Sequence, residues 1–340
     1  MAESARITSH DVARLAGVSQ SAVSRVFSGA SASKATIAKV RAAAEQLGYR
    51  PNPLARAMIT GKSRIIGLLV AYLDNQFYPV ALERLSKALQ DRGYHVLVFT
   101  GTTLSDAPDA LIQDLLDYQV DGIITASVSI SSALAKRCAD AGIPVVLFNR
   151  GQDSAVLSSV TSQNAAGGRA VAEFLVAGGH RRIAHIAGWQ GSSTGRDRAR
   201  GFRDGLAARG VTPVAETDGM YDRAAAAQAA RVLMEAPAPP DALFVGNDHM
   251  AFAVIDMLRG ALGLDVPGAV SVVGFDDVPM AAWGAYDLTT VRQPLEQMID
   301  HTVATLLRQI DDPGHATERI VLETSLIVRG SARIPQGWTR

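Results

Sequence analysis

Short apolar periodicities over the first fifty residues predict three helices. The stretch "DVARLAGVSQSAVSRVF", residues 11–27, would form one amphipathic stripe if Gly17 did not interrupt the period. Because Gly suits the position just past a helix end and Ser suits the next N-cap, we predict a tight turn and a second helix after Ser19. A third stripe lies between Ser33, a candidate N-cap, and Gly48, a candidate terminator. This is the pattern of a helix-turn-helix, although a small helical core without that role would share it.

From Ile65 onward, apolar runs with a strand-like composition alternate with helical patterns. The runs are "IIGLLVAYL", "YHVLVFTG", "DGIITAS", "PVVLFNR", "RRIAHIAG", "DALFVGND" and "VSVVGFDD". Helical patterns fill the gaps, for example over residues 77–92 and 164–177. This alternation indicates βαβ units and parallel sheets, and the number of strands favours two doubly wound α/β subdomains over a single sheet.

The side of the predicted second helix that faces away from the core carries polar and basic residues. They are Gln20, Ser21, Ser24 and Arg25, with Ser19 just before them. Amide, hydroxyl and guanidinium groups can bond base edges and phosphates of DNA. The helix therefore predicts a DNA-reading surface, in which Arg25 contacts either a base or a phosphate.

Charge is distributed unequally along the chain. Residues 1–64 contain ten Lys and Arg against three Asp and Glu, a net charge of +7, while the whole chain sums to zero. A basic segment with a helix-turn-helix is typical of a duplex binder, because phosphate contacts supply much of the affinity. The sequence thus predicts a DNA-binding domain over residues 1–50.

A short helix is predicted next, in "RPNPLARAMITGKS". Asn52 is a good N-cap, Pro53 suits the first helical position, and Gly61 would end the helix. A helix this short is unstable alone in water, so it should form only against a partner. We assign residues 51–62 to this helix and a linker.

The composition is that of a soluble globular protein, with 48% apolar and 19% charged residues among 340. The run "IIGLLVAYL" stops after nine residues, too short for a membrane span, and "MAESARITSHD" lacks the apolar core of a secretory signal. We therefore expect a cytoplasmic protein. The single cysteine, Cys138, agrees, since it can form no internal disulfide and lies in an ordinary helical pattern.

Polar residues follow several of the predicted strands. Because ligands of open parallel sheets bind beyond the carboxyl ends of the strands, these residues are candidates for a binding site. They are Asp74, Asn149, Arg150, Asn247 and Asp276.

Other residues near these positions have open interpretations. Phe77 and Tyr221 could supply a flat apolar wall, although Phe77 could equally be plain core. We interpret Asp248 and Asp277 as helix caps or solvated loop residues, and Asp276 could also cap a loop instead of contacting a ligand.

Catalytic motifs are not evident. "GWQGSSTGR" lacks the spacing and lysine of a phosphate-binding loop, and no G-x-G-x-x-G follows the first strand. The seven histidines are scattered singly, and no nucleophile elbow is present. We expect neither an enzyme nor a cofactor or metal site.

In their order, these motifs resemble the lactose and galactose repressor (LacI/GalR) family of bacterial transcription factors over essentially the whole chain. "DVARLAGVSQSAVSRVFSG" is similar to the family's DNA-reading helices and "YRPNPLARAMITGKS" to its hinge helix. "GLLVAYLDNQFYPVALERL", "DGIITAS", "PVVLFNR", "GRDRARGF", "VGNDHMAFAVI", "SVVGFDDVP" and "LTTVRQP" follow the order of its sensor core.

The resemblance implies a periplasmic-binding-protein-like core over residues 63–340, crossed three times by the chain. One subdomain would take about 63–162 and 291–321, and the other 163–290 and 322–340. It also implies a repressor at the bacterial nucleoid that binds a pseudo-palindromic operator as a homodimer and responds to a small metabolite, often a sugar. The alternative is a sugar-binding or sugar-modifying protein whose basic arm has another role.

Residues of the DNA-binding arm carry over from the family one by one. Gln20, Ser21 and Arg25 match its reading positions. Met58 stands where the family's hinge helix usually has a Leu that wedges into the minor groove, and methionine is an acceptable wedge.

Residues of the sensor carry over less completely. Arg198 matches the family's effector-binding arginine, and with Asp276 on the opposite wall of the cleft it would hold one hydroxylated effector. Asn149 and Gln163 stand where the family often has Asp, so the bonding pattern of a particular sugar does not transfer.

Overall fold

The computed structural model describes residues 7–28, 31–50, 62–71, 73–100, 117–127, 132–152 and 156–340. The chain divides into two compact units, Met1–Arg64 and Ile65–Arg340. Among the described residues, no helix combines the length and the apolarity needed to cross a bilayer. The helix predicted over residues 53–60, with Met58, lies outside the described residues.

The first unit holds the helices α1 (Ser9–Ala16), α2 (Gln20–Ser28) and α3 (Lys34–Leu47). The turn between α1 and α2 forms where the sequence predicts it. Gly17 takes a left-handed φ of 61°, which suits glycine, and Ser19 Oγ accepts a hydrogen bond from the Ala22 amide at the start of α2. α3 begins after the N-cap Ser33 and ends at Gly48.

A small apolar core joins the three helices. Val12, Val23 and Val40, one from each helix, are at most 1% exposed. Because these residues belong to the apolar stripes of the sequence, the prediction of a helix-turn-helix closed by a third helix is confirmed.

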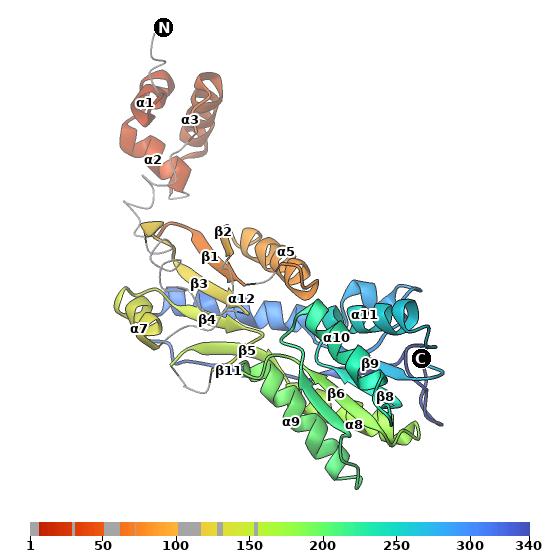
Figure 1. Cartoon of the computed structure of the whole chain (residues 1–340). Coiled ribbons are helices and arrows are strands. Elements are labelled where there is room, and N and C mark those ends of the chain that lie inside the picture. Colours follow the sequence, from red (N-terminus) through yellow and green to blue (C-terminus); the bar gives the residue numbers. More distant parts are fainter. Residues whose placement is uncertain are drawn as a thin grey trace. The chain divides into compact units, whose positions relative to one another are not determined.

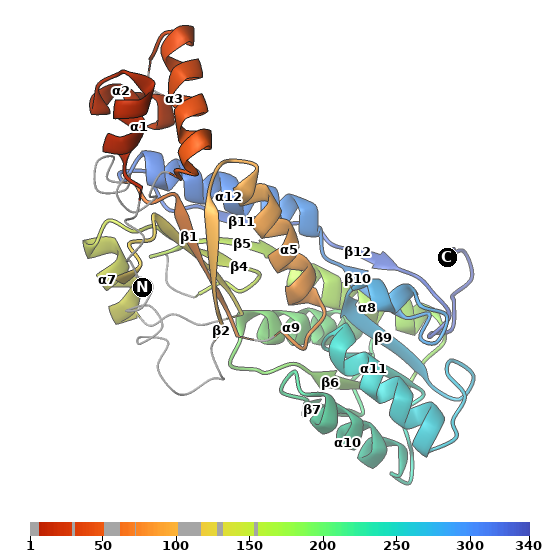
Figure 2. The same cartoon turned by 90° about the horizontal axis from the view of Figure 1, so that it is seen from above.

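The second unit contains two sheets, and the first has the strand order β11-β5-β4-β3-β1-β2 with all neighbours parallel (Figures 1 and 2). Its described strands are β1 (Ile65–Val70), β2 (His95–Thr100), β3 (Gly122–Ala126), β4 (Val145–Phe148), β5 (Ser158–Ser162) and β11 (Arg319–Leu322). The helices that accompany it are α5 (Phe77–Gln90), α7 (Ser132–Asp140) and α12 (Leu295–Asp311).

The second sheet has the order β12-β10-β9-β8-β6-β7 and is parallel except for β12. Its strands are β6 (Ile183–Ala187), β7 (Ala215–Asp218), β8 (Ala242–Val245), β9 (Ser271–Asp276), β10 (Thr289–Arg292) and β12 (Ser325–Ile327). Its helices are α8 (Asn164–Ala177), α9 (Ser193–Ala207), α10 (Arg223–Met234), α11 (Asp248–Asp256), the π-helical turn η1 (Met257–Ala261) and the 3₁₀ helix η2 (Pro279–Ala282).

Helices cover both faces of the second sheet. Alternate residues of a strand point to opposite faces, and β8 follows this rule. Ala242 and Phe244 join the core formed with α8 and α9, while Leu243 and Val245 join the core formed with α10 and α11. Two helical layers around a central parallel sheet confirm the predicted doubly wound α/β architecture.

The chain passes between the two sheets at three places. The connections follow β5 at residue 163, β10 at residues 293–294 and β11 at residues 323–324. Only these short segments join the two halves of the second unit in the chain, so any change in their geometry moves one sheet relative to the other.

Glycines let α8 and α9 pack with their backbones in contact. A Cβ on Gly168 would lie 2.3 Å from the Arg198 carbonyl oxygen, and one on Gly201 would lie 1.9 Å from that of Ala165. Both distances are far inside van der Waals contact, so a larger residue would push the helices apart. This close crossing brings the start of α8 next to Arg198.

Seven predicted strands are found, as β1, β2, β3, β4, β6, β8 and β9. The short strands β5, β7, β10, β11 and β12 were not predicted from the sequence. β5 ("SSVTS") and β7 ("AETD") are polar, and β7 and β11 lie at sheet edges, where apolar runs are not required.

Candidate functional site

A pocket lies between the two sheets, where the carboxyl ends of their strands face each other. Asp74, Asn75, Tyr78, Asn149 and Arg150 line it from the side of the first sheet. Thr194, Arg198, Tyr221, Asn247 and Asp276 line it from the side of the second. Seven of the eight residues proposed from the sequence as effector contacts are thus brought together, and Asn75, Tyr78 and Thr194 are additions.

The position of the pocket follows from the topology. In each sheet the strand order reverses next to the first strand, between β1 and β3 and between β6 and β8, and a crevice opens at such a point. The pocket has a free volume of about 20 Å³, which holds little more than one water molecule. A larger ligand therefore requires the two halves to separate.

Arg198 is the most extensively bonded side chain of the pocket. Its Nε donates to Asn164 Oδ1 at 2.8 Å, and its Nη1 donates to the Gly246 carbonyl oxygen at 2.8 Å. Its Nη2 lies 3.1 Å from Asp276 Oδ1, and the guanidinium carbon lies 3.7 Å from the centre of the Phe275 ring. With 3% exposure, Arg198 is fixed in one orientation before any ligand binds.

Asp276 continues this network to the segments that join the two halves. Gln293 Nε2 donates to Asp276 Oδ1 at 2.8 Å, and Ser162 Oγ donates to Gln293 Oε1 at 2.7 Å. Asn164 Nδ2 donates to the Ser162 carbonyl oxygen at 3.0 Å, and Asn164 also bonds Arg198. These five residues form a closed ring that links the pocket to two of the three crossings. Gln293 was not predicted from the sequence as part of the site.

The expectation that Asp276 and Arg198 lie on opposite walls of the cleft is wrong. Both belong to the half built on the second sheet, on β9 and α9, and they bond each other directly. Their proximity depends on the close packing of α8 and α9, which strand order alone does not reveal. The wall that faces them consists of Asp74, Asn149 and Arg150 with their neighbours.

On that opposite wall, Arg150 reaches across the cleft. Its Nη1 donates to the Ser127 carbonyl oxygen at 2.6 Å, and its guanidinium lies 5.8 Å from the Trp189 ring and 5.7 Å from the Tyr221 ring. A hydrogen bond of 3.0 Å from the Gly151 amide to Ser193 Oγ also spans the two halves. The cleft is therefore closed in this structure.

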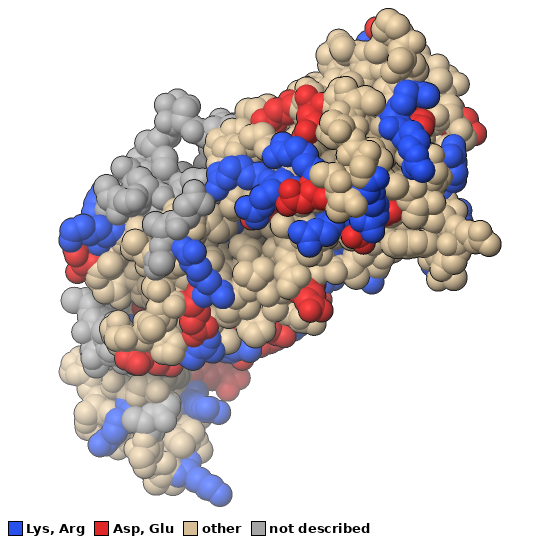
Figure 3. Space-filling view, turned by 90° about the horizontal axis from the view of Figure 1, so that it is seen from below, with Lys and Arg blue, Asp and Glu red and all other residues tan. Residues whose placement is uncertain are grey.

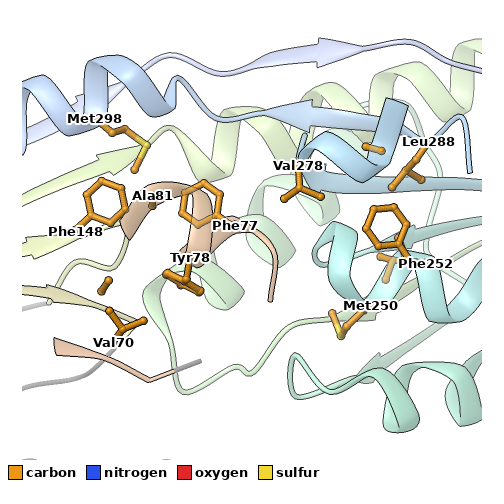
Figure 4. Packing of buried hydrophobic residues seen from close by; sticks show 14 of the residues in the cluster. Val70, Phe77, Tyr78, Ala81, Phe148, Met250, Phe252, Val278, Leu288 and Met298 are labelled. Atoms are coloured by element: carbon orange, nitrogen blue, oxygen red, sulfur yellow. The ribbon is translucent and has the colours of Figure 1, made fainter. Parts of the chain in front are cut away.

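Phe77 does not line this pocket. Its ring is 3% exposed, stacks on Phe148 with 6.3 Å between ring centres, and packs beside Ala81 and Met298 (Figure 4). The proposed role as an effector contact is thus not supported, and the alternative of plain core is the observed one. The next residue, Tyr78, faces the pocket and bonds Asn149 Nδ2 at 3.2 Å.

Three residues of the pocket have positive φ angles. Asn149 has φ 68°, Tyr221 has φ 59° and Asp276 has φ 126°. Residues other than glycine adopt such angles rarely and at a cost, and they do so most often at functional sites. This strain is consistent with a site that the surrounding fold holds in place.

Asp248 and Asp277 are not solvated. Asp248 is fully buried and accepts hydrogen bonds from Thr290 Oγ1 at 2.5 Å and from the Val278 amide at 3.0 Å, while Asn247 is the N-cap of α11. The sequence interpretation was therefore wrong for Asp248. It was also wrong for Asp277, whose side chain is 5% exposed and accepts from Arg292 and Arg329.

Asp248 and Asp276 are two neighbouring buried carboxyls. Burial, together with the charge of Asp276, raises the pKa of Asp248 to about 8. Burial also raises the pKa of Asp276, but Arg198 and Gln293 oppose this effect. Asp248, which has no cationic partner among the described residues, is therefore the one that holds a proton at neutral pH.

The Asp248→Asn substitution should remove a pH dependence of stability. A carboxyl whose pKa is higher in the folded state stabilises the fold fully below its unfolded pKa near 4, and this contribution is lost as the pH rises toward about 8. Over this range the free energy of unfolding should fall by roughly 1 kcal/mol per pH unit in the wild type. Asparagine can donate to Thr290 and accept from Val278, so the variant should show a flatter profile in urea denaturation at pH 5 to 8.

An exposed carboxyl provides the control for this measurement. The side chain of Asp91 is 62% exposed, so Asp91→Asn should show the same dependence of unfolding free energy on pH as the wild type. A wild-type profile that rises with pH, or an equal slope in Asp248→Asn, would contradict a proton on Asp248.

The candidate DNA-reading residues lie on one helix of the first unit. Ser19, Gln20, Ser21, Ser24 and Arg25 are all exposed. Ser19 Oγ caps α2 and lies 2.9 Å from Ser21 Oγ, and Gln20 Nε2 donates to Ser9 Oγ at 3.1 Å. Ser19 thus has a structural role at the start of the helix, while Ser24 and Arg25 extend from its exposed side.

A basic helix-turn-helix in the same chain as a two-sheet core with a polar pocket at the strand ends defines a ligand-responsive DNA-binding regulator. Comparisons with known proteins agree. Residues 8–52 match the model of the bacterial regulatory proteins of the lacI family, and residues 172–332 match a periplasmic binding protein-like domain. The regulator CelR of Thermobifida fusca is 36% identical over 96% of this chain and 98% of its own length. The chain therefore belongs to the lacI family.

Further relatives are also transcriptional regulators. The ribose operon repressor of Escherichia coli K12 is 30% identical over 96% of this chain and 99% of its own length. The structure of a CelR–cellobiose complex has 33% identity and a TM-score of 0.69, covering 96% of this chain and 100% of that one. The lac repressor dimer bound to operator and the anti-inducer ONPF has 28% identity and a TM-score of 0.85, covering 96% and 98%.

Proposed function

We propose that this protein is a transcriptional repressor that binds a pseudo-palindromic operator as a homodimer and that a carbohydrate in the pocket changes its operator affinity. The arrangement of the relatives supports this proposal, since one of them is a dimer on operator DNA and another is a cellobiose complex. A two-fold dimer places two reading helices in successive major grooves, so the two half-sites should mirror each other.

The observation that carries the ligand response is the buried ring around Arg198 and Asp276. Because Gln293 bonds Asp276 and Ser162, a ligand that engages the pocket acts on the segments that join the two halves. Binding can shift the conformation only if the ligand has unequal affinity for the open and closed forms. The closed pocket, with room for about one water molecule, cannot hold a sugar unchanged, so this inequality is expected.

The residue roles belong to this proposal. Gln20, Ser21, Ser24 and Arg25 would contact operator DNA, with Ser19 fixing the start of their helix. Met58, outside the described residues, would wedge into the minor groove. The domain limits follow as residues 1–50 for DNA binding, 51–62 for the hinge and 63–340 for ligand binding and dimerisation. Such a protein would act in the cytoplasm, on the DNA of the nucleoid.

Operator affinity of the full chain, with and without ligand, tests the proposal. Selection from random duplexes should return two symmetric half-sites. Carbohydrates that raise the melting temperature of the protein should then change its affinity for the selected duplex by about 5- to 150-fold, the usual range of allosteric coupling. Enrichment of asymmetric sites would contradict binding as a two-fold dimer, and turnover of the carbohydrate would favour the alternative class of sugar-modifying proteins.

A further inference from the structure

Arg150 differs from Arg198, the other arginine of the pocket, because no carboxylate among the described residues neutralises it. It is 8% exposed, and its Nε is buried without a hydrogen-bond partner. Its Nη1 donates to a neutral acceptor, the carbonyl oxygen of Ser127. In the part of the chain that the structure describes, no Asp or Glu oxygen lies within 4.0 Å of its guanidinium.

Several other arginines of the two halves do have a carboxylate partner. Arg198 bonds Asp276, and on the protein surface Arg203 bonds Glu216 at 3.2 Å. Basic and acidic side chains accordingly lie next to one another on the face shown in Figure 3. A buried Arg cannot release its proton to escape the cost of burial, so an unpaired guanidinium in a pocket requires an anion from elsewhere.

The carboxylates of the pocket do not supply that anion. Asp276 is occupied by Arg198 and Gln293. Asp74 has a side chain that is 74% exposed, and its nearest basic partner is His249 Nε2 at 3.7 Å. The pocket lining thus holds two guanidinium groups and two carboxylates, but the buried carboxylate of Asp276 is already paired with Arg198 and that of Asp74 is exposed.

The geometry of Arg150 points to the kind of anion. Since Nη1 is bonded to Ser127, the edge formed by Nε and Nη2 is the one left for a ligand, and this edge binds a carboxylate or phosphate side-on through two hydrogen bonds. The pocket lining also contains neutral polar groups that can hydrogen-bond the hydroxyls of a ligand. They are the side-chain hydroxyls of Thr194 and Tyr221 and the side-chain amide of Asn149. Tyr78 bonds one polar atom of that amide, and the other has no partner.

We infer that the effector is an acidic carbohydrate, whose carboxylate or phosphate bonds Arg150 while its hydroxyls meet the neutral groups of the pocket. This inference rests on the proposed function and narrows its ligand class. Cleft opening would expose the Nε edge, and closure on the ligand would replace an unpaired buried cation by an ion pair.

Thermal shifts of the full-length protein without DNA test the charge of the ligand. The probes are matched pairs, D-glucose with D-glucuronate, D-galactose with D-galacturonate, and D-glucose with D-glucose 6-phosphate, together with neutral cellobiose. We expect an acidic member to raise the melting temperature at a concentration where its neutral partner does not. The uronates carry a carboxylate and glucose 6-phosphate carries a phosphate, so a comparison of their thermal shifts shows which of the two groups the protein binds.

Variants assign the effect to Arg150. Arg150→Gln should weaken binding of the acidic sugar by about 10-fold or more, because a charge-assisted hydrogen bond is lost, and Arg150→Lys should retain part of the affinity. Arg200, an exposed residue of α9 that pairs with Asp197 at 2.8 Å, provides the matched control as Arg200→Gln and should bind like wild type. The melting temperature of ligand-free Arg150→Gln should not fall, since the substitution removes an unpaired buried charge.

Two results would overturn the inference. One is a neutral sugar that stabilises the protein as well as or better than every acid; the other is an acid whose binding is the same in Arg150→Gln as in wild type. Operator binding, measured separately, would remain intact in both cases if the proposed function holds. Loss of operator binding by the wild type would instead reject the proposed function and leave the thermal-shift result standing.

Discussion

Arg198→Met is expected to lower the free energy of unfolding by about 3–5 kcal/mol, because it leaves the Asp276 carboxylate buried without its cationic partner. The side chain of Asp276 is 5% exposed, so water cannot replace the guanidinium. The variant also removes the bonds to Asn164 and Gly246 that hold the buried ring together. Urea denaturation of the full chain at pH 7, compared by midpoint and slope, measures the loss.

A double variant separates the ion pair from the packing. Arg198→Met combined with Asp276→Asn removes both charges and should recover a large part of the stability lost in Arg198→Met. Because Arg198 belongs to the buried ring, we also expect that Arg198→Met alone no longer changes its operator affinity with a carbohydrate that stabilises the wild type. A variant with wild-type stability and an intact response would show that the pair is not a structural link of the pocket.

Arg25→Ala is expected to lower the affinity for the selected operator by about 10- to 100-fold while changing non-specific DNA binding little, since a base contact contributes about 1–3 kcal/mol of discrimination. The side chain lies exposed on α2 and is not required for the core of the first unit, so the fold should persist. Fluorescence anisotropy with operator and scrambled duplexes at several salt concentrations provides the measurement.

Arg14 supplies the control for this variant. Its side chain is 81% exposed on α1 and pairs with Asp11, so Arg14→Ala removes the same charge from the unit at a different place. Arg25→Ala could instead weaken the affinity for operator and for scrambled DNA equally, and reduce the slope of log affinity against log salt concentration by about one. Arg25 would then hold a phosphate and not read a base.

Local signals explain why so much of the fold was predictable. Gly17 and Gly48 take left-handed φ angles that few residues other than glycine favour, and the Ser33 hydroxyl accepts a hydrogen bond from the Thr36 amide at the start of α3, so the structure has all three signals. The long apolar strands were equally clear because a parallel sheet buries both of its faces. The rule that ligands bind beyond strand ends then placed five of the ten residues that line the pocket.

Features that depend on packing between distant segments escaped the sequence analysis. Phe77 and Tyr78 are neighbours on α5, and only the rotation of the helix decides that Tyr78 faces the pocket. Arg198 pairs with Asp276 because glycines let α8 and α9 cross closely. Asp248 appeared to be a solvated loop residue, since nothing local shows that Thr290 and Val278 enclose it.

Coupling between the carbohydrate pocket and operator binding in one chain is tested most directly by reciprocal titration. A carbohydrate that binds the full-length protein should change operator affinity by some factor, and saturating operator should change carbohydrate affinity by the same factor. We predict equal factors of about 5- to 150-fold in wild type and a factor near one in Arg198→Met at a temperature where that variant is folded. Independent binding of the two ligands to the wild-type protein, with both factors equal to one, would contradict the account.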